Sequence, residues 1–150
     1  PHPPIMIGGG APKVLGLAGE LADIVSINFN NSAGVVGSNS IASSTADETD
    51  KKIQWVRDGA GNRFDEIELE TALYFVSVEG RSEITADALM ARTGLSREEI
   101  VDFPHAGVGS VDEICEALIR RRERYGFSYI TVGDANIDAF APVIEKLKGK

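Results

Sequence analysis

The sequence predicts an α/β fold built on parallel strands. Short aliphatic segments alternate with segments of helical periodicity four times along the 150 residues. Three of the predicted strands are apolar at consecutive positions, as expected when helices cover both faces of a sheet. Strand–helix–strand units of this kind form right-handed crossovers over parallel strands. We therefore expect one parallel sheet with its helices packed against it.

Four strands are expected, over residues 5–7, 24–29, 69–78 and 129–132. The first follows two prolines and stops at a run of three glycines, and the last stops at Gly133. Residues 69–78 are rich in β-branched and aromatic side chains, which favour extended backbone. The uneven spacing of the strands indicates no internal repeat and no second domain.

The first helix is expected over residues 11–22. Val14, Leu17, Ala18 and Leu21 recur there at helical spacing, and Pro12 falls in the first turn, where proline is tolerated. The last helix is expected over residues 137–147. It carries an apolar stripe that we expect to face inward, and proline at position 142 predicts a kink or a later start; the stripe consists of Ile137, Phe140, Ala141, Ile144 and Leu147.

Capping boxes mark three further helix starts. Thr45, Ser96 and Ser110 each precede a glutamate by three residues. The helix after Ser110 has the clearest apolar stripe, and Gly126 stands where a C-terminal cap glycine belongs. The remaining stretch, 30–45, is rich in Asn, Gly and Ser and is expected to form the one long loop. It is either a lid over a ligand at the end of the preceding strand or a plain connection.

Composition excludes several classes of partner and compartment. Fifteen Lys and Arg against 23 Asp and Glu give a formal charge of −8, which disfavours nucleic acid and anionic membranes. No apolar run approaches the roughly 18 residues of a membrane span, and no secretory leader pattern is visible. A single cysteine excludes an internal disulfide. We expect a cytoplasmic protein with a small-molecule ligand.

The strongest local signal is the turn from the first strand into the first helix, through Gly8, Gly9 and Gly10. Glycines let the backbone approach a ligand, and the free N–H groups of the helix start then favour an anion such as phosphate. Lys13 adds a positive charge. Lysine at position 13 departs from the dinucleotide-binding fingerprint, and no P-loop motif is present. The alternative is a tight turn without a ligand.

Other candidate residues are weaker. His105 has no metal-ligating neighbour and is expected to be structural or solvent-facing, and Cys115 is expected in the core. No metal site and no catalytic carboxylate pair is predicted, because the acidic residues are spread over helix surfaces. Asn28, Asn30 and Asp134 follow strands, where ligand contacts gather. The arginines of residues 120–124 are expected to form a solvated helix end.

Four segments together resemble the luciferase-like monooxygenase family. They are Pro3-Pro4-Ile5-Met6-Ile7-Gly8-Gly9-Gly10, the run from Ala18-Gly19-Glu20-Leu21-Ala22-Asp23 to Asn28, the run Pro104-His105-Ala106-Gly107-Val108-Gly109-Ser110-Val111-Asp112-Glu113-Ile114, and residues 122–132. The best match is the branch that depends on coenzyme F-420. The resemblance covers essentially the whole chain.

The resemblance implies the C-terminal half of a (β/α)8 TIM barrel, so that residues 1–150 form one (β/α)4 unit matching strands five to eight. The implied cofactor is coenzyme F-420 or FMN, and Asn28 is implied to face the substrate. The backbone implied to hold the cofactor's phosphate-bearing tail is that of Gly8, Gly9, Gly10, Lys13 and Val14. The family's catalytic acid and base residues belong mainly to the first half and have no counterpart here, so the catalytic residues stay unknown.

Half a barrel implies a partner. A complete barrel takes about 250 residues, and the chain begins at Pro1 without Met, which favours a cut end. Open edge strands and a wide apolar inner face would then need a cover, either a missing N-terminal half or a second copy.

These features favour part of an oxidoreductase or monooxygenase, inactive alone, in which Gly10→Asp abolishes cofactor binding by the intact barrel. The alternative is a non-catalytic binding or assembly module, a half-barrel or a small flavodoxin-like sheet, that dimerises.

Overall fold

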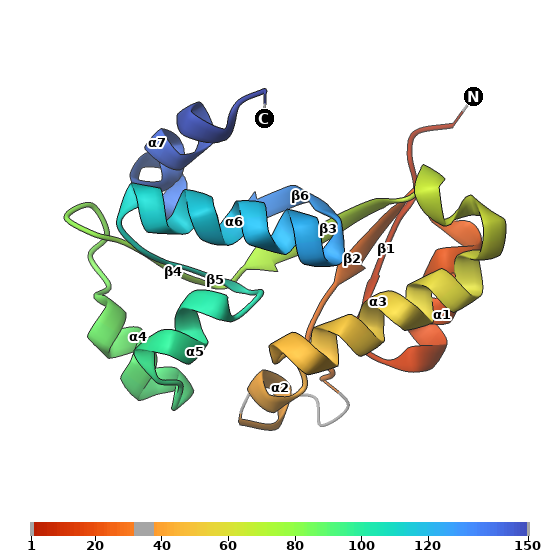
Figure 1. The fold of residues 1–150 in the computed structure, drawn as a ribbon, viewed down its shortest axis with the longest axis horizontal. Coiled ribbons are helices and arrows are strands. Elements are labelled where there is room, and N and C mark those ends of the chain that lie inside the picture. The colour runs from red at the N-terminus through yellow and green to blue at the C-terminus, as the bar shows by residue number, and fades with distance from the viewer. Residues whose placement is uncertain (1, 32–37, 150) are drawn as a thin grey trace.

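A computed structural model describes residues 2–31 and 38–149 and confirms the parallel α/β architecture (Figure 1). The main sheet has four parallel strands in the order β1-β2-β3-β6. They are β1 (Met6–Gly9), β2 (Ile24–Ile27), β3 (Glu68–Leu73) and β6 (Phe127–Val132). A parallel pair, β4 (Phe75–Val78) and β5 (Ala106–Gly109), continues from the end of β3.

The expected helices are present, and their ends follow the capping signals. Ser96 and Ser110 each form a complete capping box, Thr45 accepts a hydrogen bond from the N–H of Glu48, and Gly126 adopts the left-handed conformation with φ of 84°. The α-helices are α1 (Pro12–Leu21), α2 (Ser38–Ala42), α3 (Ala46–Ala60), α4 (Ala86–Thr93), α5 (Arg97–Asp102), α6 (Val111–Tyr125) and α7 (Ile137–Leu147); η1 (Gly61–Glu66) and η2 (Asp134–Asn136) are 3-10 turns.

Two predictions about connections were incomplete. The predicted strand 69–78 is interrupted at Tyr74, so that its first part joins the main sheet and its second part pairs with β5. β5 was not predicted, because its sequence Ala-Gly-Val-Gly lacks the β-branched pattern of a strand. The predicted loop 30–45 contains α2, and its residues 32–37 lie outside the described residues, so the lid stays a prediction.

Helices α1 and α3 pack on one face of the sheet and cross each other through glycines. A Cβ on Gly59 would lie 2.0 Å from the main-chain oxygen of Gly16, and one on Gly19 would lie 2.2 Å from that of Val56. This close approach turns Leu15 and Ala18 into the core, whereas Val14, Leu17 and Leu21 are 41–54% exposed. The predicted periodicity of α1 therefore identified a helix, but most of its apolar stripe lies on the outside.

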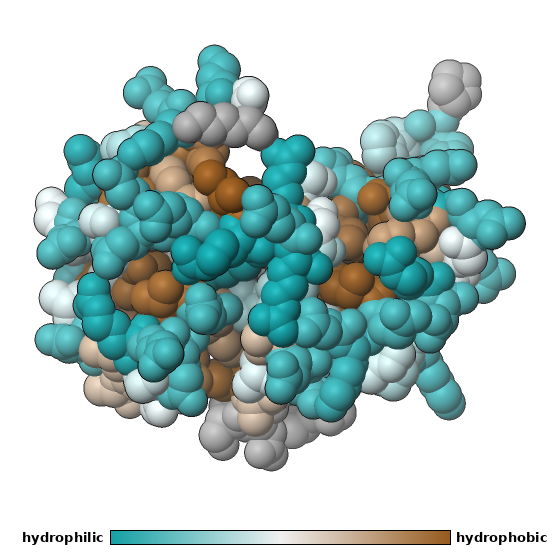
Figure 2. Space-filling model, in the orientation of Figure 1, coloured by the Kyte–Doolittle hydropathy of each residue, from teal (hydrophilic) through white to brown (hydrophobic). Residues whose placement is uncertain are grey.

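In the last helix, too, part of the predicted apolar stripe lies on the outside. α7 runs unbroken from Ile137 with Pro142 inside it, so it does not start later. Phe140 and Val143 are buried, but Ala141 is exposed and Ile137 and Ile144 are each 54% exposed, against the prediction that all three face inward. With α6 and β6, α7 encloses an apolar groove of about 720 Å³ that includes Leu118, Ile119, Ile130, Ile144 and Leu147. Figure 2 shows apolar side chains at the surface where α6 and α7 meet.

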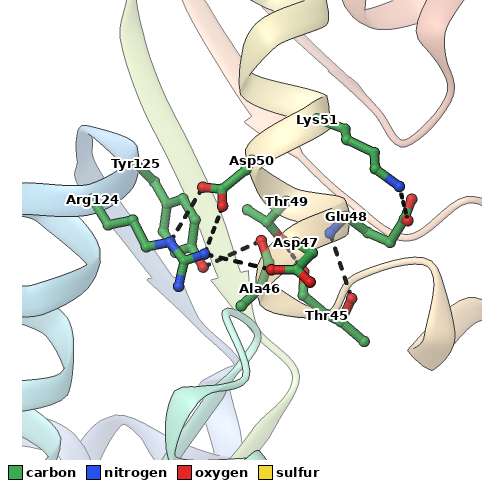
Figure 3. Close-up of polar contacts among 9 residues, drawn as sticks. All are labelled: Thr45, Ala46, Asp47, Glu48, Thr49, Asp50, Lys51, Arg124 and Tyr125. Atoms are coloured by element: carbon green, nitrogen blue, oxygen red, sulfur yellow. Dashed lines mark hydrogen bonds and ion pairs between the residues drawn. The ribbon is translucent and has the colours of Figure 1, made fainter.

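A polar contact joins the N-terminal part of α3 to the C-terminal end of α6 (Figure 3). Arg124 donates to both carboxylate oxygens of Asp50, at 3.2 and 2.6 Å, and lies 3.8 Å from the carboxylate of Asp47. The Tyr125 hydroxyl donates to the carbonyl of Ala46 at 3.5 Å. These contacts tie the helices over β1 and β2 to the helices over β4, β5 and β6.

The other face of the main sheet carries a polar row, so it is not the uniformly apolar inner face that was predicted. Val25 and Ile27 of β2 point toward α1 and α3, so Ser26 between them points away. In register with Ser26 lie Gly8, Glu70 and Tyr129, which form one row across all four strands. This row has no aliphatic side chain. Within the described ranges, no helix is long and apolar enough to cross a membrane.

Candidate functional site

A cleft of about 660 Å³ opens at the C-terminal ends of the strands, the edge where open parallel sheets bind ligands. Its walls come from the end of β1, the segment after β2, the junction of β3 and β4, and α4. They consist of Gly8, Gly9, Asn28, Phe29, Asn31, Tyr74, Phe75 and Arg92. Three of the six predicted site residues, namely Gly8, Gly9 and Asn28, thus lie together.

Asn28 is held by its main chain from two sides. Its N–H donates to the carbonyl of Gly9 at 2.8 Å, and its own carbonyl accepts from the ammonium of Lys52 at 2.6 Å. A Cβ on Gly8 would lie 3.0 Å from the side-chain amide nitrogen of Asn28. Glycine at position 8 therefore leaves the room that this amide occupies.

The side chain of Asn28 belongs to a chain of four hydrogen-bonded groups. The Tyr74 hydroxyl donates to Asn28 Oδ1 at 2.6 Å, and Asn28 Nδ2 donates to Ser26 Oγ at 3.0 Å. The Ser26 hydroxyl in turn donates to the carboxylate of Glu70. We name Tyr74, Asn28, Ser26 and Glu70 the relay. It runs from a half-exposed phenol at the cleft to a carboxylate that is 3% exposed.

Sequence reasoning did not find Glu70, because it treated the acidic residues as helix-surface charges. The available signal was a glutamate in the interior of a predicted strand, where a buried charge needs a partner. In the structure, burial raises the pKa of Tyr74, and the charge of Glu70 raises it further. The phenol is therefore neutral over the physiological pH range.

Lys52 is a buried cation behind the cleft. Its side chain is 1% exposed and donates to the Asn28 carbonyl and to Ser44 Oγ, at 2.6 and 2.7 Å. Burial lowers its pKa to about 8, against a smaller opposing effect of Glu48. Lys52 thereby joins α3 to the end of β2, where the cleft begins.

An aromatic cluster forms the floor beneath the cleft. The ring of Phe29 lies 4.5 Å from that of His105 and 5.1 Å from that of Tyr74. His105 is fully buried, with Nδ1 2.9 Å from the carbonyl of Ala72 and with Nε2 lacking a partner. Burial lowers the pKa of His105 to about 4. His105 is thus a neutral core residue, consistent with the structural role predicted for it.

The remaining predicted residues lie beside the cleft. Lys13 and Val14 are exposed in the first turn of α1, whose N-cap residue, Ala11, provides no side-chain hydrogen bond. Gly10 is buried, and a Cβ there would lie 2.2 Å from the main-chain oxygen of Phe29. Packing alone therefore requires glycine at position 10, so Gly10→Asp tests the fold before it tests a ligand.

Two further predictions concern α6. Cys115 lies in the core, as expected. Arg121 contradicts the predicted solvated cluster, since it is 4% exposed and donates to the carbonyls of Ala106 and Val101 at 2.6 and 2.7 Å. The interior position of Arg121 follows from the helical spacing that it shares with Leu118 and Tyr125. Burial lowers its pKa to about 10.

The other strand-end residues do not reach the cleft. The Asn30 N–H donates to Ser43 Oγ at 3.0 Å, and the exposed Asp134 accepts from the N–H of Ala135 at 2.9 Å. In the described part of the chain, no three His, Cys, Asp or Glu side chains gather as a metal site.

Comparisons with known proteins give fold similarity. No family model and no curated protein matches the sequence. A coenzyme F420 dependent tetrahydromethanopterin reductase from Methanopyrus kandleri is 18% identical, with a TM-score of 0.55 over 89% of this chain and 45% of that one. A long-chain alkane monooxygenase is 14% identical, with a TM-score of 0.60 over 97% of this chain and 41% of that one.

The chain spans less than half the length of each of these two structures. At these identities the similarity shows the fold. It confirms the predicted resemblance to luciferase-like barrels at that level, with the strands and helices of this chain matching part of each barrel.

Proposed function

We propose that this chain is the cofactor-binding part of a luciferase-like oxidoreductase that uses coenzyme F-420 or FMN. One observation carries the proposal, namely that a cleft with glycine backbone, aromatic rings and a cation opens at the C-terminal edge of the sheet. Gly8 and Gly9 admit a ligand close to the main chain, and the nearly buried Phe29 and Phe75 contribute apolar lining. Arg92, whose guanidinium lies 5.4 Å from the Phe75 ring centre, supplies positive charge.

These residues fit a flavin-like group. Its phosphate-bearing tail would meet the first turn of α1, where Lys13 and Val14 are exposed and the helix start has free N–H groups. Asn28 would form part of the wall on the substrate side. Such a cofactor supplies hydride or oxygen chemistry, and this chain binds it, orients it and excludes water.

The proposal is tested by titrating the protein with FMN and with coenzyme F-420 and following their fluorescence. We expect micromolar or tighter binding of one of them. Lys13→Ala should weaken it several-fold by removing a charge near the phosphate, whereas the matched control Lys146→Ala, on α7, should leave it unchanged. Absence of binding by the wild-type chain and by its assembly with a covering half would refute the proposed function.

The two edges of the main sheet support a second part of the proposal. β1 and β6 each pair with one strand of the described chain, and apolar side chains flank both edges. Beside β1 these are Ile5, Met6, Leu17 and Leu21, and beside β6 they line the groove of α6 and α7. We propose that a further set of strand–helix units covers both edges, provided by an N-terminal half or, for the isolated chain, by a second copy.

The groove of α6, β6 and α7 also favours a second candidate function, a non-catalytic assembly module. Such a module would associate through this groove without binding either cofactor. Association without binding of FMN or coenzyme F-420 would therefore favour the module over the oxidoreductase.

A further inference from the structure

The relay has a direction, which follows from what each group can donate. The main-chain oxygen of Ser26 can only accept, and it lies 3.4 Å from Asn28 Nδ2. The amide nitrogen must therefore face Ser26, and Asn28 Oδ1 must face Tyr74. Ionised Glu70 accepts only, so the Ser26 hydroxyl must donate to it. Every proton in the relay points away from the cleft and toward Glu70.

The relay orients groups but does not transfer protons. An amide such as that of Asn28 stands between the phenol and the serine, and it passes a proton only through a high-energy tautomer. Hydrogen bonds in series polarise one another, and the carboxylate at the end strengthens the polarisation. The consequence at the cleft is that the Tyr74 proton is occupied by Asn28, while the lone pairs of its oxygen stay available.

We propose that the Tyr74 hydroxyl is held as a hydrogen-bond acceptor, so that the cleft selects ligands that present an N–H or O–H donor to it. Tyr74 is 49% exposed and lines the cleft, whereas Glu70 is 3% exposed and sets this polarity from a distance through Ser26 and Asn28. Gly8 contributes to the same arrangement, because a Cβ at position 8 would lie only 3.0 Å from Asn28 Nδ2 and would crowd this amide. Tyr74 is a specificity-determining residue, and Glu70 is a positioning residue.

Replacing Glu70 by glutamine removes the charge that polarises the relay. The Asn28 amide keeps its orientation, because its nitrogen still faces the main-chain oxygen of Ser26. Without the carboxylate, Asn28 Oδ1 accepts the Tyr74 proton less strongly, and this proton can turn into the cleft and oppose a ligand donor. Glu70→Gln should therefore harm binding although it leaves Tyr74 in place.

The inference rests on the proposed function only in its choice of probe, FMN, which carries a ring imide N–H and ribityl hydroxyls. Tyr74→Phe should weaken FMN binding about fivefold, the effect of one lost hydrogen bond. Glu70→Gln should also weaken it, although it leaves Tyr74 in place. The matched control is Glu68→Gln, an exposed glutamate on the same strand and face outside the relay, and it should bind as the wild type does. Wild-type affinity in either Tyr74→Phe or Glu70→Gln would overturn the inference.

A measurement without ligand separates this inference from the proposed function. The ultraviolet absorbance of phenolate is titrated with pH, and subtraction of the Tyr74→Phe curve isolates Tyr74. Glu70→Gln should lower the pKa of Tyr74, because it removes a buried negative charge, and Glu68→Gln should not. If Glu70→Gln fails to fold, Ser26→Ala breaks the relay between Asn28 and Glu70 and should weaken FMN binding at least twofold. If neither FMN nor coenzyme F-420 binds, the proposed function fails, and an unchanged pKa of Tyr74 in Glu70→Gln overturns the relay independently.

Discussion

His105 makes the stability of the fold depend on acidity. Burial lowers its pKa to about 4 in the folded chain, against 6.5 for the ordinary side chain. Between these values the unfolded chain binds more protons, so stability is complete above pH 6.5 and falls as the pH drops toward 4. At about 1.4 kcal/mol per pKa unit, the loss reaches roughly 3 kcal/mol. Urea unfolding at a series of pH values measures it.

The substitution His105→Gln tests whether His105 causes this dependence of stability on pH. His105→Gln keeps a donor for the carbonyl of Ala72 but cannot titrate, so the difference in unfolding free energy between wild type and variant should shrink as the pH falls from 6.5 to 4. The other histidine, His2, is exposed, and His2→Gln should retain the wild-type slope. If the difference in unfolding free energy between wild type and His105→Gln were independent of pH, the prediction would be contradicted.

Replacing Gly10 tests whether packing requires glycine at this predicted ligand-binding position. Gly10→Ala places a Cβ 2.2 Å from the Phe29 carbonyl oxygen, so the backbone must move, and we expect a loss of about 1–3 kcal/mol in chemical denaturation. Gly133 is the control, because its φ is −66° and the nearest atom to an added Cβ lies 3.8 Å away. Gly133→Ala should change stability by less than about 1 kcal/mol. Equal effects of the two variants would show that the contact at Gly10 relaxes without cost.

At the scale of elements, the crossing of α1 and α3 requires glycine at position 59 of α3 but not at position 16 of α1. Gly59→Ala would place a Cβ 2.0 Å from the Gly16 oxygen and should destabilise the chain by about 1–3 kcal/mol. Gly16→Ala meets nothing nearer than 4.0 Å and should stabilise it by up to about 1 kcal/mol through helix propensity. Thermal unfolding followed by circular dichroism separates the signs. A stabilising Gly59→Ala would mean that the helices do not approach as closely as described.

This crossing also shows what sequence could and could not predict. Helix starts were predicted because capping depends on neighbours in the sequence, such as Ser110 and Glu113. The exposure of most of the apolar stripe of α1 was not predicted, because the glycines at 16 and 59 meet only in the folded chain. Likewise Gly8 and Asn28 were predicted from their places at strand ends, but the relay required the register that sets Ser26 beside Glu70.

Helix α6 carries two arginines of different energetic importance. Arg121 is buried and donates to two carbonyls, so Arg121→Ala leaves these carbonyls unpaired and should cost at least about 2 kcal/mol. Arg124 bridges α6 to Asp50 and Asp47 at the surface, where ion pairs contribute about 1 kcal/mol or less (Figure 3). Arg124→Ala should therefore have a small effect that fades in high salt. A comparable loss for both variants in urea unfolding would contradict this difference in burial.

The whole molecule combines two open sheet edges with a polar row on the sheet face opposite α1 and α3. Its four parallel strands have hydrogen-bonding groups unpaired at β1 and β6 within the described chain, and such edges favour pairing with further strands. The row of Gly8, Ser26, Glu70 and Tyr129 is suited to the interior of a ligand-binding barrel rather than to an apolar dimer interface. Association should therefore proceed through the edges and their flanking helices, with the polar row enclosed.

The edge beside β6 is the place to test this association. We expect the 150-residue chain to sediment at twice its 16.0 kDa mass or more at micromolar concentration. Ile144 lines the groove of α6, β6 and α7 and is 54% exposed, so Ile144→Asp should shift the protein to monomer without lowering its helix content. Ile84 is similarly exposed, at 47%, but lies between β4 and α4 away from both edges, and Ile84→Asp should leave association intact. A wild-type chain that stays monomeric, or equal dissociation by both variants, would refute closure through this edge, because burial of the groove is the source of the expected free energy.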